Sequence, residues 1–343
     1  MNHSMADYLK IVTPYLHSNL ISSQSLSDLQ NLAKILPPFY HAGFECRLGP
    51  NSSSRVDLTV SLTRRQLSNL PIYLLKYNVW QVLQKITEEW IDPTSLLYKG
   101  MKTLNLEFDI DENSNPIPNI FIEFNSEYVD ILALINIILQ RFKYYVSNNL
   151  IINIQRCINF LPKNTKIVHF GIMLPRPTNA MRIVVEGIQV EHILEYLQQI
   201  GFADPTGKLK TIIHELSNIN IGFLSFDVGD TIHNRIGLEC FPVEQDELGW
   251  QKNFEYLINN NLCSLSKQIA VMKWPGWSQK DTVLDLWPEH LDWGDNFLGN
   301  QATSVFFRQI NHIKIVYQPN VPLDAKIYLS FGHRWLDYDD INT

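Results

Sequence analysis

Alternation of apolar and polar residues dominates the segment His312–Trp335 near the end of the chain. Apolar side chains occupy every second position of Ile313–Tyr317 and again of Ile327–Phe331. A period of two puts successive side chains on opposite faces of a strand, so Lys314 and Lys326 lie opposite the aliphatic residues. Two prolines and an asparagine separate the two runs, as suits a turn. The segment therefore predicts a β-hairpin with one apolar face and one face that carries ammonium groups.

The same alternation recurs upstream, and short polar or Pro/Gly-containing loops join the two halves of each pair. The further hairpins are Phe44–Leu48 with Arg55–Thr63, Thr103–Ile110 with Asn119–Asn125, Lys166–Arg176 with Ala180–Gly187, and Ile221–Asp230 with Arg235–Phe241. Between hairpins the apolar spacing changes to the helical period. The helices expected there cover residues 5–17, 25–36, 66–90, 128–147, 150–161, 190–200, 209–216, 245–259 and 262–272. The Trp-rich segment 274–299 indicates no regular element.

Repetition of a helical segment followed by a hairpin predicts an α+β fold with five helix–hairpin repeats in one domain, residues 1–343. Amphipathic strands with helices between successive hairpins favour a closed ten-stranded antiparallel β-barrel surrounded by helices, because closure removes exposed sheet edges. If helices cover the outside, the polar face of each strand lines the interior. Such a barrel encloses a roomy cavity, whereas side chains fill the lumen of an ordinary small barrel.

In its order of elements the chain resembles the ABBA prenyltransferases, whose five α–β–β–α repeats close into a barrel. Enzymes of that family transfer a prenyl group from a prenyl diphosphate to an aromatic ring or another nucleophile. The resemblance covers nearly the whole chain but includes no DDxxD-type run. Phe44–Gly49 (FECRLG) followed by Ser54–Leu62 (SRVDLTVSL) is most similar to the cyanobactin prenyltransferases, which modify ribosomal peptides. The resemblance implies a prenyl diphosphate, dimethylallyl or longer, as co-substrate, and a peptide or aromatic small molecule as acceptor.

Cations on the polar strand faces are the strongest candidates for ligand binding. Arg or Lys points inward on four of the five hairpins, and the residues are Arg47, Arg182, Arg235, Lys314 and Lys326. A diphosphate leaving group needs several converging cations, because its developing negative charge must be stabilised in the transition state. We therefore expect these residues to bind the diphosphate. The alternative is an ordinary sheet with this face in solvent, where each cation pairs with a neighbouring Asp or Glu.

Glu45 on the first strand is the catalytic candidate. In the family that the chain resembles, a Glu on that strand takes the proton from the acceptor or steadies the carbocation. A carboxylate in a partly apolar cavity is expected to have a raised pKa, which suits a general base. The alternative is a surface ion pair between Glu45 and Arg47, two residues apart on one strand face. Aromatic residues shield allylic cations in the family, and the candidates for shielding the prenyl group or the acceptor are Tyr328, Phe121, Phe223 and His169.

Acidic residues are numerous among the positions expected in the lumen, which include Glu107, Asp109, Glu123, Asp227 and Glu239. They are able to coordinate Mg²⁺ that bridges to a diphosphate, or to pair with the cations. Both interpretations stay open at this point. His169, His312 and His333 lack the spacing of metal ligands and are interpreted as hydrogen-bonding side chains. The metal ligands, if there are any, are therefore unknown.

Composition and charge narrow the choice of partners. The 343 residues are 45% hydrophobic with a net charge of −7, which disfavours general attraction to nucleic acid or an anionic membrane. Four widely spaced cysteines without a CxxC pair indicate reduced thiols in a cytoplasmic protein. The N-terminal segment lacks the regions of a signal peptide. The longest apolar run, Val129–Phe142, is too short to span a bilayer and is expected to be a buried helix.

Two other functions compete with prenyl transfer. The same barrel can serve as a non-catalytic module that binds a peptide or an anion, with the Trp-rich segment as the recognition surface. An unrelated α+β hydrolase can use the lumen carboxylates and a metal. The Trp cluster itself (Trp274, Trp277, Trp287 and Trp293) is expected to be core, and His333 is expected to have a structural role at the barrel rim.

Overall fold

The computed structural model describes residues 3–64, 71–110, 116–125, 130–176, 178–216, 219–244 and 246–337. Its strands are β1 (His41–Arg47), β2 (Val56–Leu62), β3 (Met101–Phe108), β4 (Asn119–Phe124), β5 (Lys166–Ile172), β6 (Met181–Glu186), β7 (Asn220–Val228), β8 (Ile232–Phe241), β9 (Gly276–Ser278), β10 (Ala302–Tyr317) and β11 (Asp324–Asp337). Each predicted hairpin is present, and most of its strands end within a few residues of the predicted bounds.

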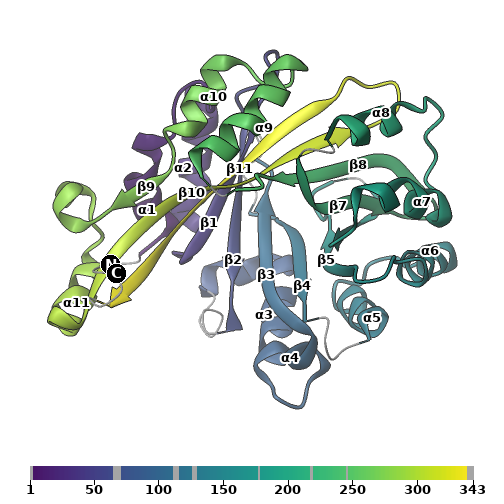
Figure 1. Ribbon diagram of the computed structural model, residues 1–343. Helices are drawn as coiled ribbons and strands as arrows, with labels where there is room; N and C mark the ends of the chain where they lie inside the picture. Colours follow the sequence, from purple (N-terminus) through teal and green to yellow (C-terminus); the bar gives the residue numbers. More distant parts are fainter. Residues whose placement is uncertain are drawn as a thin grey trace.

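The strands form one closed antiparallel barrel (Figure 1). Neighbours follow chain order from β1 to β8; then β8 pairs with β10, β10 with β11, and β11 with β1. The short β9 pairs with β10 outside this ring of ten strands. The predicted ten-stranded barrel is therefore confirmed, and closure leaves the ring without free edges.

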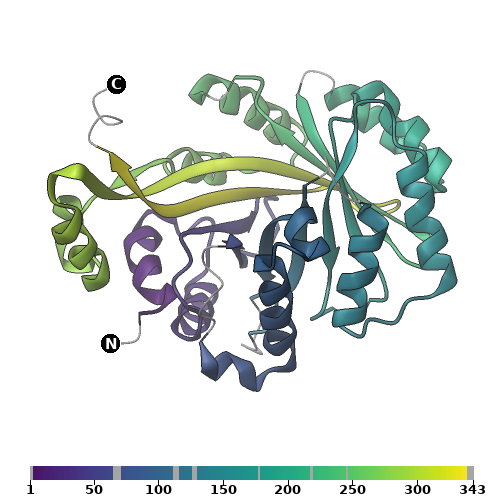
Figure 2. The same ribbon diagram turned by 90° about the horizontal axis from the view of Figure 1, so that it is seen from below.

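Helices lie between successive hairpins and surround the barrel (Figures 1 and 2). The α-helices are α1 (Met5–Val12), α2 (Ser23–Ile35), α3 (Asn78–Ile91), α4 (Leu96–Gly100), α5 (Ile131–Arg141), α6 (Asn148–Asn159), α7 (Val190–Ile200), α8 (Lys208–Glu215), α9 (Glu247–Asn259), α10 (Leu265–Met272) and α11 (Glu289–Leu298). Side-chain caps fix several starts: Ser22 accepts from the Ser25 amide and Asp130 from the amides of Leu132 and Ala133. The beginnings of the predicted helices 66–90 and 128–147 lie outside the described residues.

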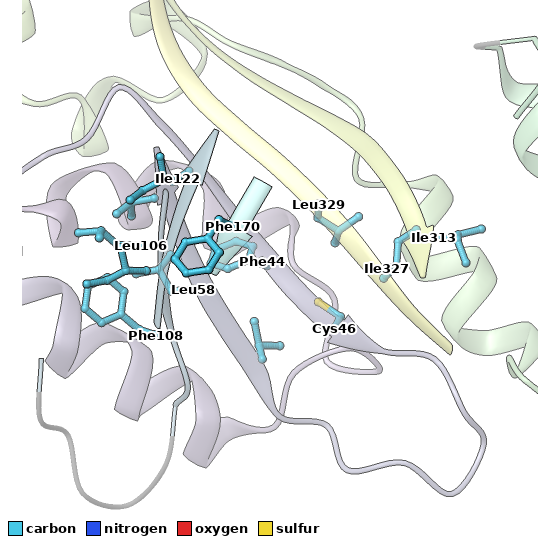
Figure 3. Close-up of a cluster of buried hydrophobic side chains, with 14 of the residues drawn as sticks. Phe44, Cys46, Leu58, Leu106, Phe108, Ile122, Phe170, Ile313, Ile327 and Leu329 are labelled. Atoms are coloured by element: carbon cyan, nitrogen blue, oxygen red, sulfur yellow. The ribbon is translucent and has the colours of Figure 1, made fainter. Parts of the chain in front are cut away.

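The outer face of the barrel is apolar and buried beneath these helices. Figure 3 shows part of it, where Phe44, Leu58, Leu106 and Phe170 gather on one side of the sheet. All four side chains are almost fully excluded from solvent. Burying each such side chain contributes about 1.5–3 kcal/mol, so this shell holds the barrel closed while its polar face is turned inward.

The hairpin β10–β11 is longer than the others, with 16 and 14 residues, and it projects beyond the barrel towards α11 and the chain termini (Figure 1). The predicted hairpin began at His312, whereas the strand begins at Ala302. On this extension Tyr8 packs edge-on against Phe306, and Ser304 Oγ lies 2.5 Å from His333 Nε2. The expected structural role of His333 thus agrees with its burial and contact.

The Trp-rich segment is more ordered than predicted and less buried. It contains β9, α11 and two short 3₁₀ helices, and a third begins at its last residue. Trp274 and Trp287 are buried, as expected for core residues. Trp277 and Trp293 are 56% and 65% exposed, so the core prediction is wrong for these two. They lie on β9 and on α11, outside the ring of ten strands.

Candidate active site

An interior cavity of about 360 Å³ occupies the middle of the barrel. Its lining includes the four predicted shielding residues. We call this cavity the aromatic chamber, and the ring-bearing residues that point into it are His41, Phe121, His169, Phe223, His312 and Tyr328. Gly171 makes room for one of them, because a Cβ there would meet the Phe121 ring at 2.5 Å. The expected cavity is therefore present, and aromatic side chains form much of its wall.

A smaller charged pocket adjoins the chamber on the side of the hairpin turns. We call it the cation pocket; its basic lining residues are Arg176, Arg182, Arg235, Lys314 and Lys326, and its acidic ones are Glu45, Glu107 and Asp227. Four residues line both cavities, namely Glu107, Arg182, Lys314 and Tyr328. A ligand with an anionic head and an apolar tail would therefore find a cationic and an aromatic compartment in direct contact.

Each predicted lysine in the cation pocket has a carboxylate partner. Lys326 Nζ lies 2.6 Å from Glu45 Oε1, and Lys314 Nζ lies 2.9 Å from Glu239 Oε1. Gly237 on β8 leaves space for the lysine stem, because a Cβ at this position would lie 2.2 Å from Lys314 Cε. Both lysines are thus anchored with their ammonium groups inside the barrel.

The arginines behave differently from one another. Arg182 forms a two-pronged pair with Asp227 at 2.8 and 3.1 Å. Arg47 is not among the lining residues of either cavity; it pairs with Asp57 at 2.7 Å and with Glu45 at 3.6 Å. Arg176, which was not predicted, contacts Asp109 at 2.6 Å and Glu107 at 3.0 Å. It lies in the turn after β5, so strand alternation gave no sign of its direction.

Arg235 stands apart from the other cations. Among the residues that the structure describes, it makes no hydrogen bond and no ion pair. Burial lowers the pKa of Arg235, the neighbouring Arg182 lowers it further, and Asp227 only partly compensates. A guanidinium held next to other cations without a direct partner is favourable only if an anion binds there.

Glu45 is buried, with 3% exposure, so it does not form a surface pair with Arg47. Its two oxygens are engaged by Lys326 and by the Tyr328 hydroxyl. Burial by itself would raise the pKa of Glu45, but Lys326 and Arg47 outweigh burial and hold that pKa well below its usual range. The expected raised pKa is therefore wrong: this carboxylate stays ionised.

The carboxylates do not form a metal site of their own. No group of three or more His, Cys, Asp or Glu side chains within the described part of the chain could hold a metal ion. Glu45, Asp227 and Glu239 are each bound to an arginine or a lysine. Of the two roles left open for these acids, the structure favours pairing with the cations, and the donor set does not fit a resident Mg²⁺.

A wide mouth of about 720 Å³ opens at the opposite end of the barrel from the hairpin turns. Its lining includes Glu186, Phe223, Phe241, Val243 and Asn311, and no Lys or Arg is among the described residues that line it. Phe223 and Asn311 also line the aromatic chamber, so the two spaces are adjacent. An acceptor that enters here meets an apolar and mildly acidic rim.

Comparison with solved structures identifies the architecture. The apo form of the prenyltransferase PriB superposes with a TM-score of 0.53 at 11% identity, covering 95% of this chain and 94% of that one. The 5-dimethylallyltryptophan synthase from Streptomyces coelicolor superposes with a TM-score of 0.50 at 9% identity, covering 96% and 98%. This chain has the ABBA prenyltransferase fold. A PriB complex with L-tryptophan and dimethylallyl thiolodiphosphate has a TM-score of 0.50 at 10% identity and covers 95% and 94%.

Sequence comparison adds no further relative. No protein-family model matches the chain, and no curated protein matches it. The ABBA fold therefore rests on structure, which agrees with the prediction from element order. Within the described residues, no helix is long and apolar enough to cross a membrane.

Proposed function

We propose that this chain is a prenyltransferase that moves an allylic prenyl group from a prenyl diphosphate to an aromatic or other nucleophilic side chain of a peptide or small molecule. One observation carries the proposal: inside an ABBA barrel, a cation pocket with the unpaired Arg235 opens directly into an aromatic chamber. These two compartments match the two halves of a prenyl diphosphate. Residues 1–343 act as one domain, and the four buried free cysteines favour the reducing cytoplasm.

The cations bind and activate the donor. The residues that contact the diphosphate are Arg182, Arg235, Lys314, Lys326 and Arg176. Arg47 acts indirectly, through its ion pairs with Glu45 and Asp57. Charge-assisted contacts strengthen as the C–O bond of the donor breaks and negative charge accumulates on the leaving group. Dimethylallyl is the donor we favour, since PriB has been solved with its thiolodiphosphate analogue.

The aromatic chamber protects the allylic cation. Tyr328, Phe121, Phe223 and His169 surround the space next to the cation pocket, where ring faces stabilise positive charge and exclude water. Glu45 stays ionised beside Tyr328 and therefore steadies the carbocation electrostatically. These roles need no metal ion.

The acceptor enters through the mouth, and the charge of the mouth favours a peptide. A free amino acid would bring an α-carboxylate, for which the described lining offers Glu186 and no cation. A residue within a peptide has no such charge. This charge argument supports the cyanobactin branch independently of the similarity in β1 and β2, and we propose a peptide-borne aromatic residue as acceptor.

Product analysis tests the proposal. The protein is incubated with dimethylallyl diphosphate and either free tryptophan and tyrosine or the same residues within blocked peptides, with Mg²⁺ or with EDTA. We expect prenylated peptide both with Mg²⁺ and with EDTA, and little prenylated free amino acid in either condition. Metal-dependent diphosphate release without transfer would indicate the hydrolase, and tight binding of dimethylallyl thiolodiphosphate without turnover would indicate the non-catalytic barrel. Failure to bind dimethylallyl, geranyl and farnesyl analogues would refute the donor site.

A further inference from the structure

The pairing of β10 with β11 is interrupted at the point where the two strands pass the aromatic chamber. Register shifts between Ile310 and His312, so Asn311 is an extra residue opposite an unbroken β11. Bulges of this kind redirect side chains and are common next to active sites. Here the bulge lies at the junction of mouth and chamber, since Asn311 lines both spaces and His312 lines the chamber.

The contact with Asn311 favours a proton on Nδ1 of the His312 ring. The Asn311 side-chain oxygen lies 3.1 Å from His312 Nδ1. An amide oxygen only accepts, so Nδ1–H donates and Nε2 is left with its lone pair. Nε2 is buried and has no hydrogen-bond partner among the described residues. His312 lines the chamber, so its Nε2 is an unused proton acceptor buried next to this space.

The neighbours of His312 suit a proton acceptor. Its ring stacks on Tyr328 with centroids 4.1 Å apart, which fixes its orientation. Glu239 Oε2 lies 3.6 Å from Nε2 and would stabilise the imidazolium once a proton arrives. Burial lowers the pKa of His312 to about 4 despite Glu239, so the ring is neutral at pH 7 and free to accept.

Glu45 is placed less well for this task. Both of its oxygens already accept, one from Lys326 and one from Tyr328. It lines the cation pocket and is not among the residues that line the aromatic chamber. The proton of the acceptor is lost where the new bond forms, in the chamber, next to His312.

We propose that His312 is the catalytic base of the transfer, with Asn311 and Glu239 as its positioning residues; this inference rests on the proposed function. The C–O bond of the donor breaks and its electron pair leaves with the diphosphate. A nucleophilic electron pair of the acceptor forms the new bond to the allylic carbon. The proton displaced from the acceptor atom moves to His312 Nε2 and then leaves to solvent through the mouth. No oxidant or further reactant is needed.

Charged and titratable groups reach His312 from several strands. Glu239 on β8 and Glu45 on β1 favour the imidazolium, whereas Lys314 on β10 and His169 on β5 oppose it. Tyr328 on β11 covers one ring face. Because Lys314 will pair with the diphosphate during the reaction, its opposition weakens when the donor is bound, and His312 becomes a stronger base at the stage when a base is needed.

The test has a spectroscopic part and a kinetic part. Nitrogen NMR of ¹⁵N-histidine protein at pH 7, assigned with His312→Gln, should show protonated Nδ1 and unprotonated Nε2 for His312. In the kinetic part, prenylated product and released diphosphate are measured separately for wild type, His312→Gln and Glu45→Gln. His192→Gln is the matched control, at an exposed position on α7.

We expect His312→Gln to lower product formation about 100-fold or more, while diphosphate release falls less because water captures the cation. Its affinity for dimethylallyl thiolodiphosphate should change less than about twofold, the margin expected where no direct contact is lost, and His192→Gln should behave as wild type. A protonated Nε2 at pH 7 would overturn the role of His312. So would equal transfer rates in wild type and His312→Gln, or an equal fall in product and in diphosphate release. If the wild-type protein binds no donor analogue, the prenyltransferase proposal itself is refuted. The tautomer of His312 is measured without the donor, so the two failures can be distinguished.

Discussion

Replacing Arg235 by glutamine should weaken donor binding without weakening the fold. The guanidinium has no direct partner among the described residues, and burial and Arg182 lower its pKa. Its removal therefore relieves repulsion in the free protein, and we expect a free energy of unfolding equal to or above that of wild type. In the complex it removes a charge-assisted contact worth about 1.5–3 kcal/mol, which is a loss of about 10- to 150-fold in affinity.

Arg182→Gln provides the contrast on the same ligand. It should weaken binding to a similar degree, but it also leaves Asp227 without its two-pronged partner. An uncompensated buried carboxylate costs about 3 kcal/mol or more, so this variant should unfold at distinctly lower urea concentration. Arg141→Gln is the control for charge, since this residue pairs with Glu89 on the exposed surface.

Calorimetric titration with dimethylallyl thiolodiphosphate measures the affinity of each variant for the donor analogue, and urea unfolding measures its stability. The reasoning fails if Arg235→Gln binds the analogue as tightly as wild type. It fails equally if Arg235→Gln loses as much stability as Arg182→Gln, because Arg235 would then have a structural partner in the free protein.

Three further changes test individual contacts. Lys267→Met should lower the free energy of unfolding by about 3 kcal/mol, measured in urea, because the buried Lys267 ammonium donates to two backbone carbonyls and to Ser52 Oγ; unchanged stability would contradict this. Gly237→Ala should cost about 1–3 kcal/mol and raise the KM for the donor, since the new Cβ displaces Lys314; a normal KM would show that Lys314 does not bind the diphosphate. Burial lowers the pKa of His333 to about 4, whereas the unfolded chain protonates this histidine near pH 6.5. The free energy of unfolding should therefore fall as the pH drops from about 6.5 to about 4, by at most about 3 kcal/mol. The stability of His333→Gln in urea should therefore depend less on pH than that of wild type, and an equal slope would show that folding does not lower the pKa of His333.

Strand alternation predicted the barrel because each wall strand has one face against helices and one face against the lumen. The same rule failed where both faces are covered. Residues 302–310 of β10 are buried at nearly every position, so they show no period of two, and the strand was expected to begin only at His312. Trp277 and Trp293 misled in the opposite direction, because large apolar side chains are usually core and these two are exposed.

The candidate site was predictable in its location and less so in its chemistry. The alternation of polar residues along the strands predicted that Arg182, Arg235 and both lysines lie in the lumen, where they line the cation pocket. It gave no sign of Arg176, which projects from a turn. The protonation of Glu45 was beyond sequence reasoning, because the pKa depends on Lys326, a strand partner 281 residues away. The tautomer of His312 depends likewise on a bulge that only the register between β10 and β11 shows.

The pairing of lumen charges explains how one barrel can be stable when empty and selective when loaded. Asp227, Glu239 and Glu45 neutralise Arg182, Lys314 and Lys326 in the free protein, so their burial is tolerable. A fully paired lumen would, however, have little attraction for an anion.

Arg235 resolves this conflict, because it adds one positive charge that no carboxylate of the described lumen takes up directly. A diphosphate bound at Arg235, as we propose, would come within reach of the paired cations, each of which can share its charge between carboxylate and phosphate oxygens without being left unpaired. As the leaving group gains charge, this sharing shifts towards the phosphate. In this proposed site the same residues would then contribute more to the transition state than to the bound donor, which is the condition for accelerating the ionisation step.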